Sequence, residues 1–514
     1  MSTGTAPRAD AADLAFLEHL RASTELLESM AADWRQLDRL PPDDRRRLHR
    51  AIAALFTPDP SARRKRSKAD QRHRKAAATA REEAVLDRTG IRTLRRRPVV
   101  ATPNFFPPGE RVADEAVDRD PGGGHSGEPA RGASVDLRRC YICKQPYSVI
   151  HHFYDQLCPV CGDENFAART ELADLRGRVA LLTGGRVKIG YQAGLKLLRS
   201  GAHLIVTTRF SRDAAARYAR EPDFGEWADR LEIVGLDLRQ TPRVEAFCRE
   251  LVSSRGRLDF IVNNACQTVR RPPDFYAHLM AAETAPLEAL PAPVRKLLGE
   301  GAGPTMSEPR TADPRGAASL SQLPLLPEEF LARTDLFPAG QFDQDRQQVD
   351  LRVRNSWRLL LADVPSVELL EVQLVNAIAP FLINARLKPL MLRTPGRDRH
   401  IVNVSAVEGQ FYRRGKTTRH PHTNMAKAAL NMMTRTAAAD YHNDGIHMNS
   451  VDTGWVTDED PAEIAARKRT ELRFHPPLDI VDGAARIVAP IIAGMNSGRH
   501  TWGQFLKDFR PTDW

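Results

Sequence analysis

Four cysteines are spaced for metal binding. They form two CxxC pairs, Cys140/Cys143 and Cys158/Cys161, with fourteen residues between the pairs. Each CxxC turn directs two thiolates to one side of a tight loop, and two such turns complete the tetrahedral shell of Zn²⁺. Because this shell leaves no open position, we predict one structural zinc ion rather than a catalytic one. His151 and His152 lie between the pairs and are alternative ligands.

A glycine-rich turn supplies a second kind of chemistry. The residues Thr183-Gly-Gly-Arg-Val-Lys-Ile-Gly190 follow a short apolar run and precede a helical stretch. In such a turn, backbone N–H groups approach a pyrophosphate at the N-terminus of the helix. We therefore expect a dinucleotide site at this turn.

Cofactor choice is indicated at the end of the next apolar run. An acidic residue there would bond a ribose 2′-hydroxyl and favour NAD(H). This chain has Thr208 followed by Arg209, with Arg186 in the nearby turn. Two guanidinium groups suit a 2′-phosphate, so the sequence favours NADP(H) over NAD(H). The alternative is that Arg209 is only a solvated charge at a strand end.

The order of later motifs strengthens the dinucleotide interpretation. After the turn come Asp237-Leu238, Asn263-Asn-Ala-Cys266, Asn376, Asn403-Val-Ser405, Lys427 and Asn449-Ser-Val-Asp-Thr-Gly454. Over about residues 176–275 and 366–514 this series resembles the short-chain dehydrogenase/reductase family. The resemblance implies an α/β fold of Rossmann type, a doubly wound parallel sheet. It also implies a set of cofactor contacts: Gly184, Arg186, Lys188, Ile189, Gly190, Arg209, Asp237, Leu238, Asn264, Ala265, Lys427 and Gly454.

The resemblance also assigns catalytic positions, two of them kept and two replaced. Asn376 stands where the family's relay asparagine is expected, and Lys427 stands where its lysine is expected. Thr423 replaces the proton-donating tyrosine, and Ala406 replaces the catalytic serine, with Ser405 one residue earlier. An aliphatic alcohol is too weak an acid to take over from a phenol.

A literal YxxxK motif at Tyr412 and Lys416 offers another alignment. Lys427 precedes Asn449 by 22 residues, the family's spacing, whereas Lys416 precedes it by 33. We therefore assign the lysine role to Lys427. The residues that could replace the tyrosine lie in one loop: Tyr412, His420, His422 and Thr423.

The retained cofactor residues and the replaced tyrosine and serine leave two functions open. Lys188 replaces the family's middle glycine, so its side chain either crowds the pyrophosphate or neutralises it. The first function is an NADP(H)-dependent oxidoreductase that acts on a carbonyl or alcohol substrate with an altered proton donor. The second is an inactive NADP(H)-binding scaffold or sensor, with zinc-mediated partner binding.

The chain's 514 residues predict several units. We expect a helical hairpin and basic segment at 1–100, a flexible linker at 101–135, and a zinc module at 136–170. The Rossmann-type domain takes 176–514, with a long insertion at about 276–365. Short apolar runs at 179–182, 203–208, 231–236, 259–262, 401–404 and 446–451 predict its strands.

The net charge of +10 is confined to one segment. Residues 61–100 hold 14 Lys/Arg and 4 Asp/Glu, a difference of +10, so the other residues sum to zero. A solvated helix is the plain interpretation, and an acidic partner such as nucleic acid is the alternative. With no apolar run of about 18 residues, we expect no membrane span and a cytoplasmic protein. The N-terminal hairpin suits packing or homo-oligomerisation.

Overall fold

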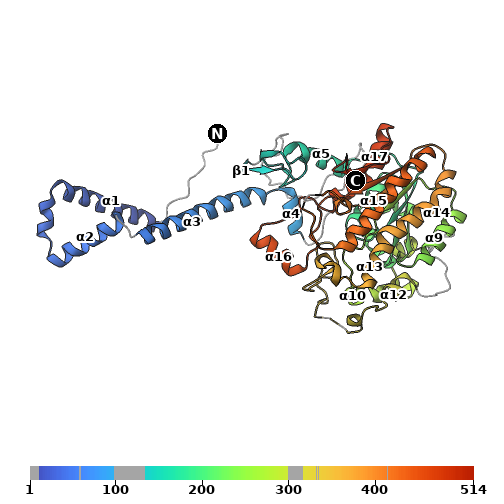
Figure 1. Cartoon of the computed structure of the whole chain (residues 1–514), viewed down its shortest axis with the longest axis horizontal. Coiled ribbons are helices and arrows are strands. Elements are labelled where there is room, and N and C mark those ends of the chain that lie inside the picture. Colours follow the sequence, from blue (N-terminus) through green and yellow to red (C-terminus); the bar gives the residue numbers. More distant parts are fainter. Residues whose placement is uncertain are drawn as a thin grey trace. The chain divides into compact units, whose positions relative to one another are not determined.

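The computed structural model describes residues 11–56, 60–97, 133–298 and 316–514, apart from 332, 334 and 414 (Figure 1). It divides the chain into two compact units, Met1–Glu82 and Glu83–Trp514. Of the predicted linker, 101–135, only the last three residues are described, and they begin a strand. Residues 299–315 of the predicted insertion also lie outside the described residues.

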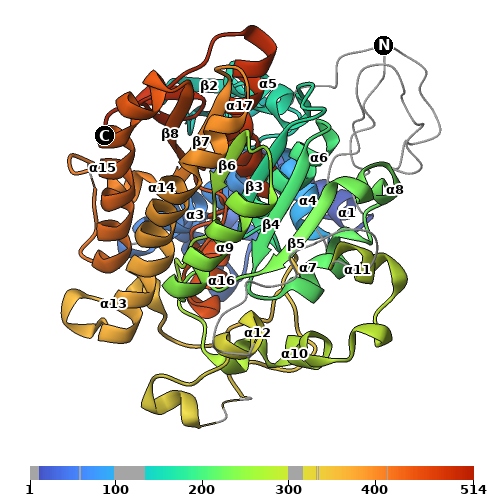
Figure 2. The same ribbon diagram turned by 90° about the vertical axis from the view of Figure 1, so that its right-hand side faces the viewer.

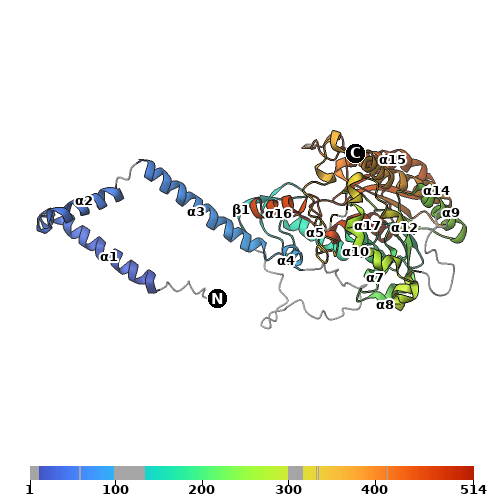
Figure 3. The same ribbon diagram turned by 90° about the horizontal axis from the view of Figure 1, so that it is seen from below.

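The first unit consists of helices, as predicted. They are α1 (Ala11–Ala32), a 3₁₀ helix (Trp34–Arg39), α2 (Pro42–Phe56) and most of α3 (Pro60–Leu86) (Figure 3). The pair Pro41-Pro42 separates the 3₁₀ helix from α2, because proline cannot continue a helix and is favoured at the start of the next. Large apolar side chains of α1 are exposed, so these helices do not form a hairpin with a core of its own.

An eight-stranded sheet organises the second unit (Figure 2). Its order is β10-β9-β8-β7-β6-β3-β4-β5, and all neighbours are parallel except β9 and β10. Strand order reverses between β3 and β6, which is where ligands bind at the carboxyl edge of such sheets. The strands are β3 (Val179–Thr183), β4 (His203–Thr208), β5 (Leu231–Gly235), β6 (Phe260–Asn263), β7 (Arg399–Ser405), β8 (Ile446–Asp452), β9 (Phe505–Lys507) and β10 (Arg510–Thr512).

Helices cover both faces of this sheet (Figure 2). Buried side chains of α6 (Lys188–Arg199), α7 (Ser211–Tyr218), α11 (Ala292–Leu297) and α17 (Ile480–Ser497) pack on one face. Those of α9 (Thr241–Ser254), α14 (Ala379–Arg393) and α15 (Pro421–Asn443) pack on the other. The sheet is therefore the doubly wound Rossmann type that the apolar runs predicted.

Smaller elements surround this core. The cysteine module comprises the hairpin β1 (Ala133–Arg139) and β2 (Pro146–Val149) with α5 (Pro159–Thr170). Helix α4 (Gly90–Arg96) packs beside it. The described part of the insertion holds α10 (Pro273–Thr284), α11 and α12 (Ala317–Ser321), with short 3₁₀ turns. Helices α8 (Phe224–Trp227), α13 (Ser366–Gln373) and α16 (Ala462–Glu471) complete the set of described helices in the unit.

One segment differs from the sequence expectation about membranes. The helical stretch Ser366–Arg393 is long and apolar enough, by length and composition only, to cross a membrane. The expectation counted uninterrupted apolar runs, and polar residues such as Asn376 and Asn384 interrupt this one. Its Ile383, Leu387 and Leu390 are buried in the core against the sheet, whereas Leu370, Ile378 and Phe381 are exposed, and 39% of its most apolar window is buried.

Candidate functional site

The glycine turn lies between β3 and α6, at the carboxyl edge of the sheet. Gly184 has a φ of +71°, a left-handed conformation that favours glycine. A Cβ on Gly190 would lie 2.2 Å from the Gly184 carbonyl oxygen and 2.3 Å from the Asn264 amide nitrogen. The α6 backbone can therefore approach the strand only because residue 190 is glycine.

Lys188 adopts the backbone conformation expected of the glycine it replaces, with a φ of +54°. Burial alone would lower the pKa of Lys188, but Glu459, Asp345 and Asp343 raise it above its ordinary value. Among the described residues, no carboxylate forms an ion pair with its ammonium within 4 Å. A positive charge thus stands at the turn, with nearby carboxylates favouring its protonated form.

Two arginines meet beside the end of β4, as the sequence predicted. Arg186 forms an ion pair with Asp213 at 2.6 Å, and its guanidinium lies 5.4 Å from the Phe210 ring centroid. Arg209 donates a hydrogen bond of 2.8 Å to the Tyr276 hydroxyl. Burial raises the pKa of Tyr276, but Arg209, Arg186 and Arg271 together hold it below its ordinary value. Three guanidinium groups therefore act on this corner, and one of them is paired with Asp213.

The residues predicted beside the adenine and ribose also gather at this edge. Asp237 is buried and is bound by Arg239 at 2.7 Å, and Leu238 is buried in the core. Asn264 donates to the backbone oxygens of Thr183 and Gly184 at 3.1 Å. Ala265 receives support from the same strand, since its N–H donates to Thr183 Oγ1 at 3.0 Å. Asn264 and Ala265 therefore shape the turn.

The retained catalytic pair is buried. Asn376 sits in a π-helical turn, Leu374–Ile378, of a kind often found at functional sites. Its Oδ1 accepts from Gln267 N at 2.7 Å, and its Nδ2 donates to Gln267 O at 3.2 Å. Lys427 Nζ donates to Val404 O at 2.8 Å. Both side chains thus bond to backbone around the carboxyl edge.

The hydroxyl side chains at or next to the replaced catalytic positions are buried. Ser405 and Thr423 are 2% and 3% exposed, and neither hydroxyl has a hydrogen-bond partner among the described residues. Ala406 offers no hydroxyl, and it begins the 3₁₀ turn that follows β7. Position 406 therefore carries no hydroxyl, and the hydroxyl of the adjacent Ser405 is buried.

Of the other loop residues, only His422 is fully buried near Thr423. Tyr412 is 96% exposed, so the structure does not bring its phenol to the site. His420 stacks on Trp357 with ring centroids 3.8 Å apart. His422 is 1% exposed, and its Nε2 lies 3.2 Å from Glu368 Oε1. Sequence reasoning missed Glu368, because it is 54 residues away and no motif marks it.

The residue that closes the predicted nicotinamide side, Gly454, follows β8. Its φ is +76°, and a Cβ there would lie 2.5 Å from Leu478 Cδ1. Its N–H donates to Asp452 Oδ2 at 3.2 Å. Asp452 also accepts from Val407 N at 3.0 Å, and burial raises its pKa. Asp452 therefore ties the loop after β8 to the loop after β7.

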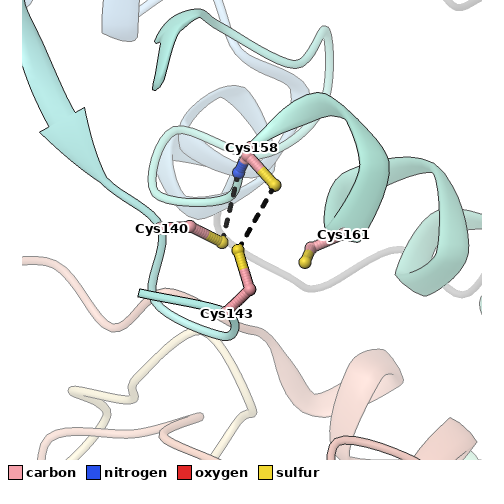
Figure 4. A group of neighbouring side chains, drawn as sticks. All are labelled: Cys140, Cys143, Cys158 and Cys161. Carbon is pink, nitrogen blue, oxygen red and sulfur yellow. Dashed lines mark hydrogen bonds between the residues drawn. The ribbon is translucent and has the colours of Figure 1, made fainter. Parts of the chain in front are cut away.

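The four cysteines form one cluster (Figure 4). Their sulfur atoms all lie within 4.8 Å of one another, and Cys143 Sγ lies 3.8 Å from Cys158 Sγ. Zn–S bonds of about 2.3 Å in a tetrahedron place sulfurs about 3.8 Å apart, so the cluster fits zinc. His151 is not a ligand here, since its Nδ1 accepts from the N–H groups of Phe153 and Tyr154 and its Nε2 meets Asp163.

Comparisons with known proteins match these features. Residues 178–281 match the family model described as short chain dehydrogenase, and residues 357–479 match enoyl-(acyl carrier protein) reductase. The insertion lies largely between the two matches.

A protein of Acanthamoeba polyphaga mimivirus, R665, is 31% identical over 385 residues, or 73% of this chain and 75% of that protein. Dehydrogenase/reductase SDR family member 13 of Bos taurus is 35% identical over 106 residues, or 20% of this chain and 28% of that protein. A short-chain dehydrogenase/reductase structure from Burkholderia multivorans with bound NADP is 16% identical, with a TM-score of 0.39 over 66% of this chain and 99% of that one. By its family-model and sequence matches, the chain belongs to the short-chain dehydrogenase/reductase family.

Proposed function

We propose that the protein is an NADP(H)-dependent oxidoreductase that interconverts a carbonyl and an alcohol. The carrying observation is Arg209, a half-buried guanidinium whose only described hydrogen-bond partner is the Tyr276 hydroxyl. Among the described residues no carboxylate forms an ion pair with Arg209, although Asp237 lies close enough to act on it electrostatically, so a bound anion would stabilise the guanidinium further. A 2′-phosphate would supply that anion, with Arg186 as the second guanidinium.

Lys188 supports the same assignment from the other end of the turn. Its ammonium stands where a pyrophosphate approaches the N-terminus of α6. No acidic residue stands at Thr208 to select a free ribose 2′-hydroxyl. We further propose that the four cysteines hold one structural Zn²⁺.

We infer that His422 takes over the tyrosine's role. NADPH, when bound, supplies a hydride to the carbonyl carbon. The proton for the oxygen then comes from an imidazolium N–H, which leaves a neutral histidine to be reprotonated from water. Nδ1 of His422 is buried without a partner among the described residues. Hydrogen bonds from His422 and Ser356 hold the pKa of Glu368 below its ordinary value against the effect of burial, so a carboxylate stands beside Nε2 of His422.

The burial of the hydroxyl side chains at the catalytic end favours a second function. Ser405, Thr423 and His422 are only 2%, 3% and 1% exposed, which argues against a proton donor that reaches a substrate, and both described hydrogen bonds of Asn376 are made with Gln267. A cofactor pocket with such a catalytic end suits a protein that binds NADP(H) without turning it over.

Turnover separates the two functions. NADPH oxidation would be followed at 340 nm against aldehydes, ketones and quinones, with wild type, His422→Asn and Tyr412→Phe. The oxidoreductase predicts turnover that His422→Asn lowers at least about 100-fold while NADPH binding persists. Tyr412→Phe, at an exposed position, should keep the wild-type rate. NADPH binding without turnover on any class would replace the enzyme with the sensor.

A further inference from the structure

The loop between β8 and α17 is held by the cysteine module. This segment, residues 453–479, is named here the cofactor loop; it begins beside Gly454 and includes α16. Tyr141 lies between the two cysteines of the first pair, and its hydroxyl accepts a hydrogen bond of 3.0 Å from Trp455 N. Trp455 directly follows Gly454, so a residue inside the metal knuckle fixes the start of the cofactor loop.

The far end of the cofactor loop is held by the same module and by α4 beside it. Gln156 Nε2 donates to His475 O at 2.7 Å, and Arg95 of α4 donates to Leu478 O at 3.1 Å. Arg169 of α5 pairs with Asp479 at 2.7 Å and with Asp482 at 2.9 Å. Asp479 caps α17 by accepting from the N–H groups of Val481 and Asp482.

A shared hydrophobic cluster joins the two parts. Cys140 and Cys161 are buried in one cluster with Val456, Leu478 and Ile480 of the cofactor loop and α17. Ile189 of the phosphate turn packs against the same cluster. A change in the sulfur shell is therefore transmitted by direct packing to both walls of the proposed cofactor pocket.

We propose that metal binding and cofactor binding are coupled through Tyr141 and this cluster, so that each strengthens the other. The proposal rests on the proposed function, since it assumes a cofactor beside Gly454 and Ile189. With zinc present, the knuckle holds Tyr141 against Trp455 and keeps the cofactor loop in its binding shape. Linkage is reciprocal. Bound NADPH must therefore raise the zinc affinity by the same factor by which bound zinc raises the NADPH affinity. A factor of roughly ten or more is expected for such a coupling.

The test measures zinc affinity of the full chain by competition with a chromophoric chelator, with and without saturating NADPH. We expect about tenfold tighter zinc with NADPH in wild type. Tyr141→Phe should keep one zinc per chain but lose most of that factor. Tyr147→Phe is the matched control, because its hydroxyl bonds inside the module, to Asp155 O at 3.3 Å.

Two results would overturn the coupling. Zinc affinity that is the same with and without bound NADPH refutes it while leaving the proposed function intact. If Tyr141→Phe keeps the wild-type ratio of zinc affinities with and without NADPH, Tyr141 does not carry the coupling. Failure of the zinc-loaded protein to bind NADPH, seen by fluorescence titration, refutes the proposed function and the coupling together.

An independent surface lies on the first unit. Helix α1 exposes a row of large apolar side chains: Leu14, Phe16, Leu17, Leu20, Leu26 and Leu27, each at least 40% exposed. Phe16, Leu20, Leu27 and Met30 follow the spacing of four and three that places side chains on one helix face. Helix α2 adds Leu48, Ile52 and Leu55 at the same spacing, with Leu55 70% exposed. Such rows are normally covered.

The net charges of α1 and α2 indicate which surface covers these apolar rows. Helix α1 carries four acidic residues and one arginine, a net −3, whereas α2 carries two acidic residues and four arginines, a net +2. Packing α1 on α1 of another copy would oppose like charges, whereas packing α1 on α2 of another copy pairs opposite ones. The exchange is reciprocal, so two copies close a four-helix arrangement with two-fold symmetry.

We infer that this surface binds the first unit of a second copy of the chain. Light scattering after size exclusion, at tens of micromolar, measures the mass of wild type and of Leu20→Glu/Leu27→Glu. The double variant should have half the wild-type mass. Leu361→Glu/Leu472→Glu, at exposed leucines of the second unit, should keep the full mass. A monomeric wild type, or an unchanged mass in the double variant, would overturn the inference. Either result overturns it even if a duplex oligonucleotide is found to bind the basic helices.

Discussion

Acidification should destabilise the second unit through a cluster of histidines at the amino ends of β7 and β8. His400 and His447 are cross-strand neighbours, and His400 Nε2 lies 3.0 Å from His500 Nδ1. His447 stacks on His500, with ring centroids 4.7 Å apart, and lies 5.3 Å from His442. Two charged groups act on the cluster: Arg397, whose carbonyl oxygen meets His447 Nε2 at 2.7 Å, and Asp398, which acts on His500.

The size of the effect follows from His447. Burial, with His500 and His442 nearby, lowers the pKa of His447 from 6.5 to about 4. As pH falls below 6.5 the unfolded chain takes up this proton first, so stability present at neutral pH is lost. For this one residue, the loss between pH 8 and pH 5 is about 2 kcal/mol. Burial also lowers the pKa values of His400 and His500, which adds to the loss.

Urea unfolding followed by tryptophan fluorescence at pH 8 and pH 5 measures this loss. His447→Gln keeps an N–H donor for Arg397 but removes the titrating group, so its loss should be smaller than the wild-type loss by about 2 kcal/mol. His203→Gln, at an exposed histidine of β4, should behave as wild type. Equal losses in wild type and His447→Gln would refute the reasoning.

Three further predictions concern the pocket and its support. Arg209→Ala should weaken NADPH binding about 10- to 100-fold in a fluorescence titration and leave NADH binding unchanged, because only NADPH carries the 2′-phosphate; equal weakening of both would contradict this role. Gly190→Ala should abolish binding of either cofactor, since the new Cβ would lie 2.2 Å from a backbone oxygen, and wild-type affinity in this variant would refute that geometry. Arg169→Ala should lower the free energy of unfolding by about 3–5 kcal/mol in urea, because the fully buried carboxylate of Asp482 and the partly buried one of Asp479 lose their partner. Arg510→Ala, which breaks an exposed pair with Glu164, should lower the free energy of unfolding by under about 1 kcal/mol. Equal losses in Arg169→Ala and Arg510→Ala would contradict the argument from burial.

Much of the Rossmann core could be predicted because its determinants are local. Each predicted apolar run falls on a strand within three residues at either end, and the strand β4 has the predicted bounds. The glycine turn was also readable, since Gly190 is demanded by a backbone contact only six residues back along the chain.

The catalytic end could not be predicted, because its partners come from distant segments. Glu368 meets His422 across 54 residues, and Gln267 meets Asn376 across 109. Neither contact leaves a periodic signal in the sequence. Similarly, no motif indicated that Tyr141 of the cysteine knuckle would hold Trp455, since the contact spans 314 residues.

The central claim is a pocket that selects a phosphorylated dinucleotide, and one titration tests it most directly. Zinc-loaded full-length protein is titrated in parallel with NADPH and with NADH, with nicotinamide fluorescence as the signal. The pocket built by Arg186, Arg209 and Lys188 predicts saturable binding of one NADPH per chain, at least about tenfold tighter than NADH. Equal affinity for the two would contradict the role of the arginines, and no binding of either would contradict the pocket itself.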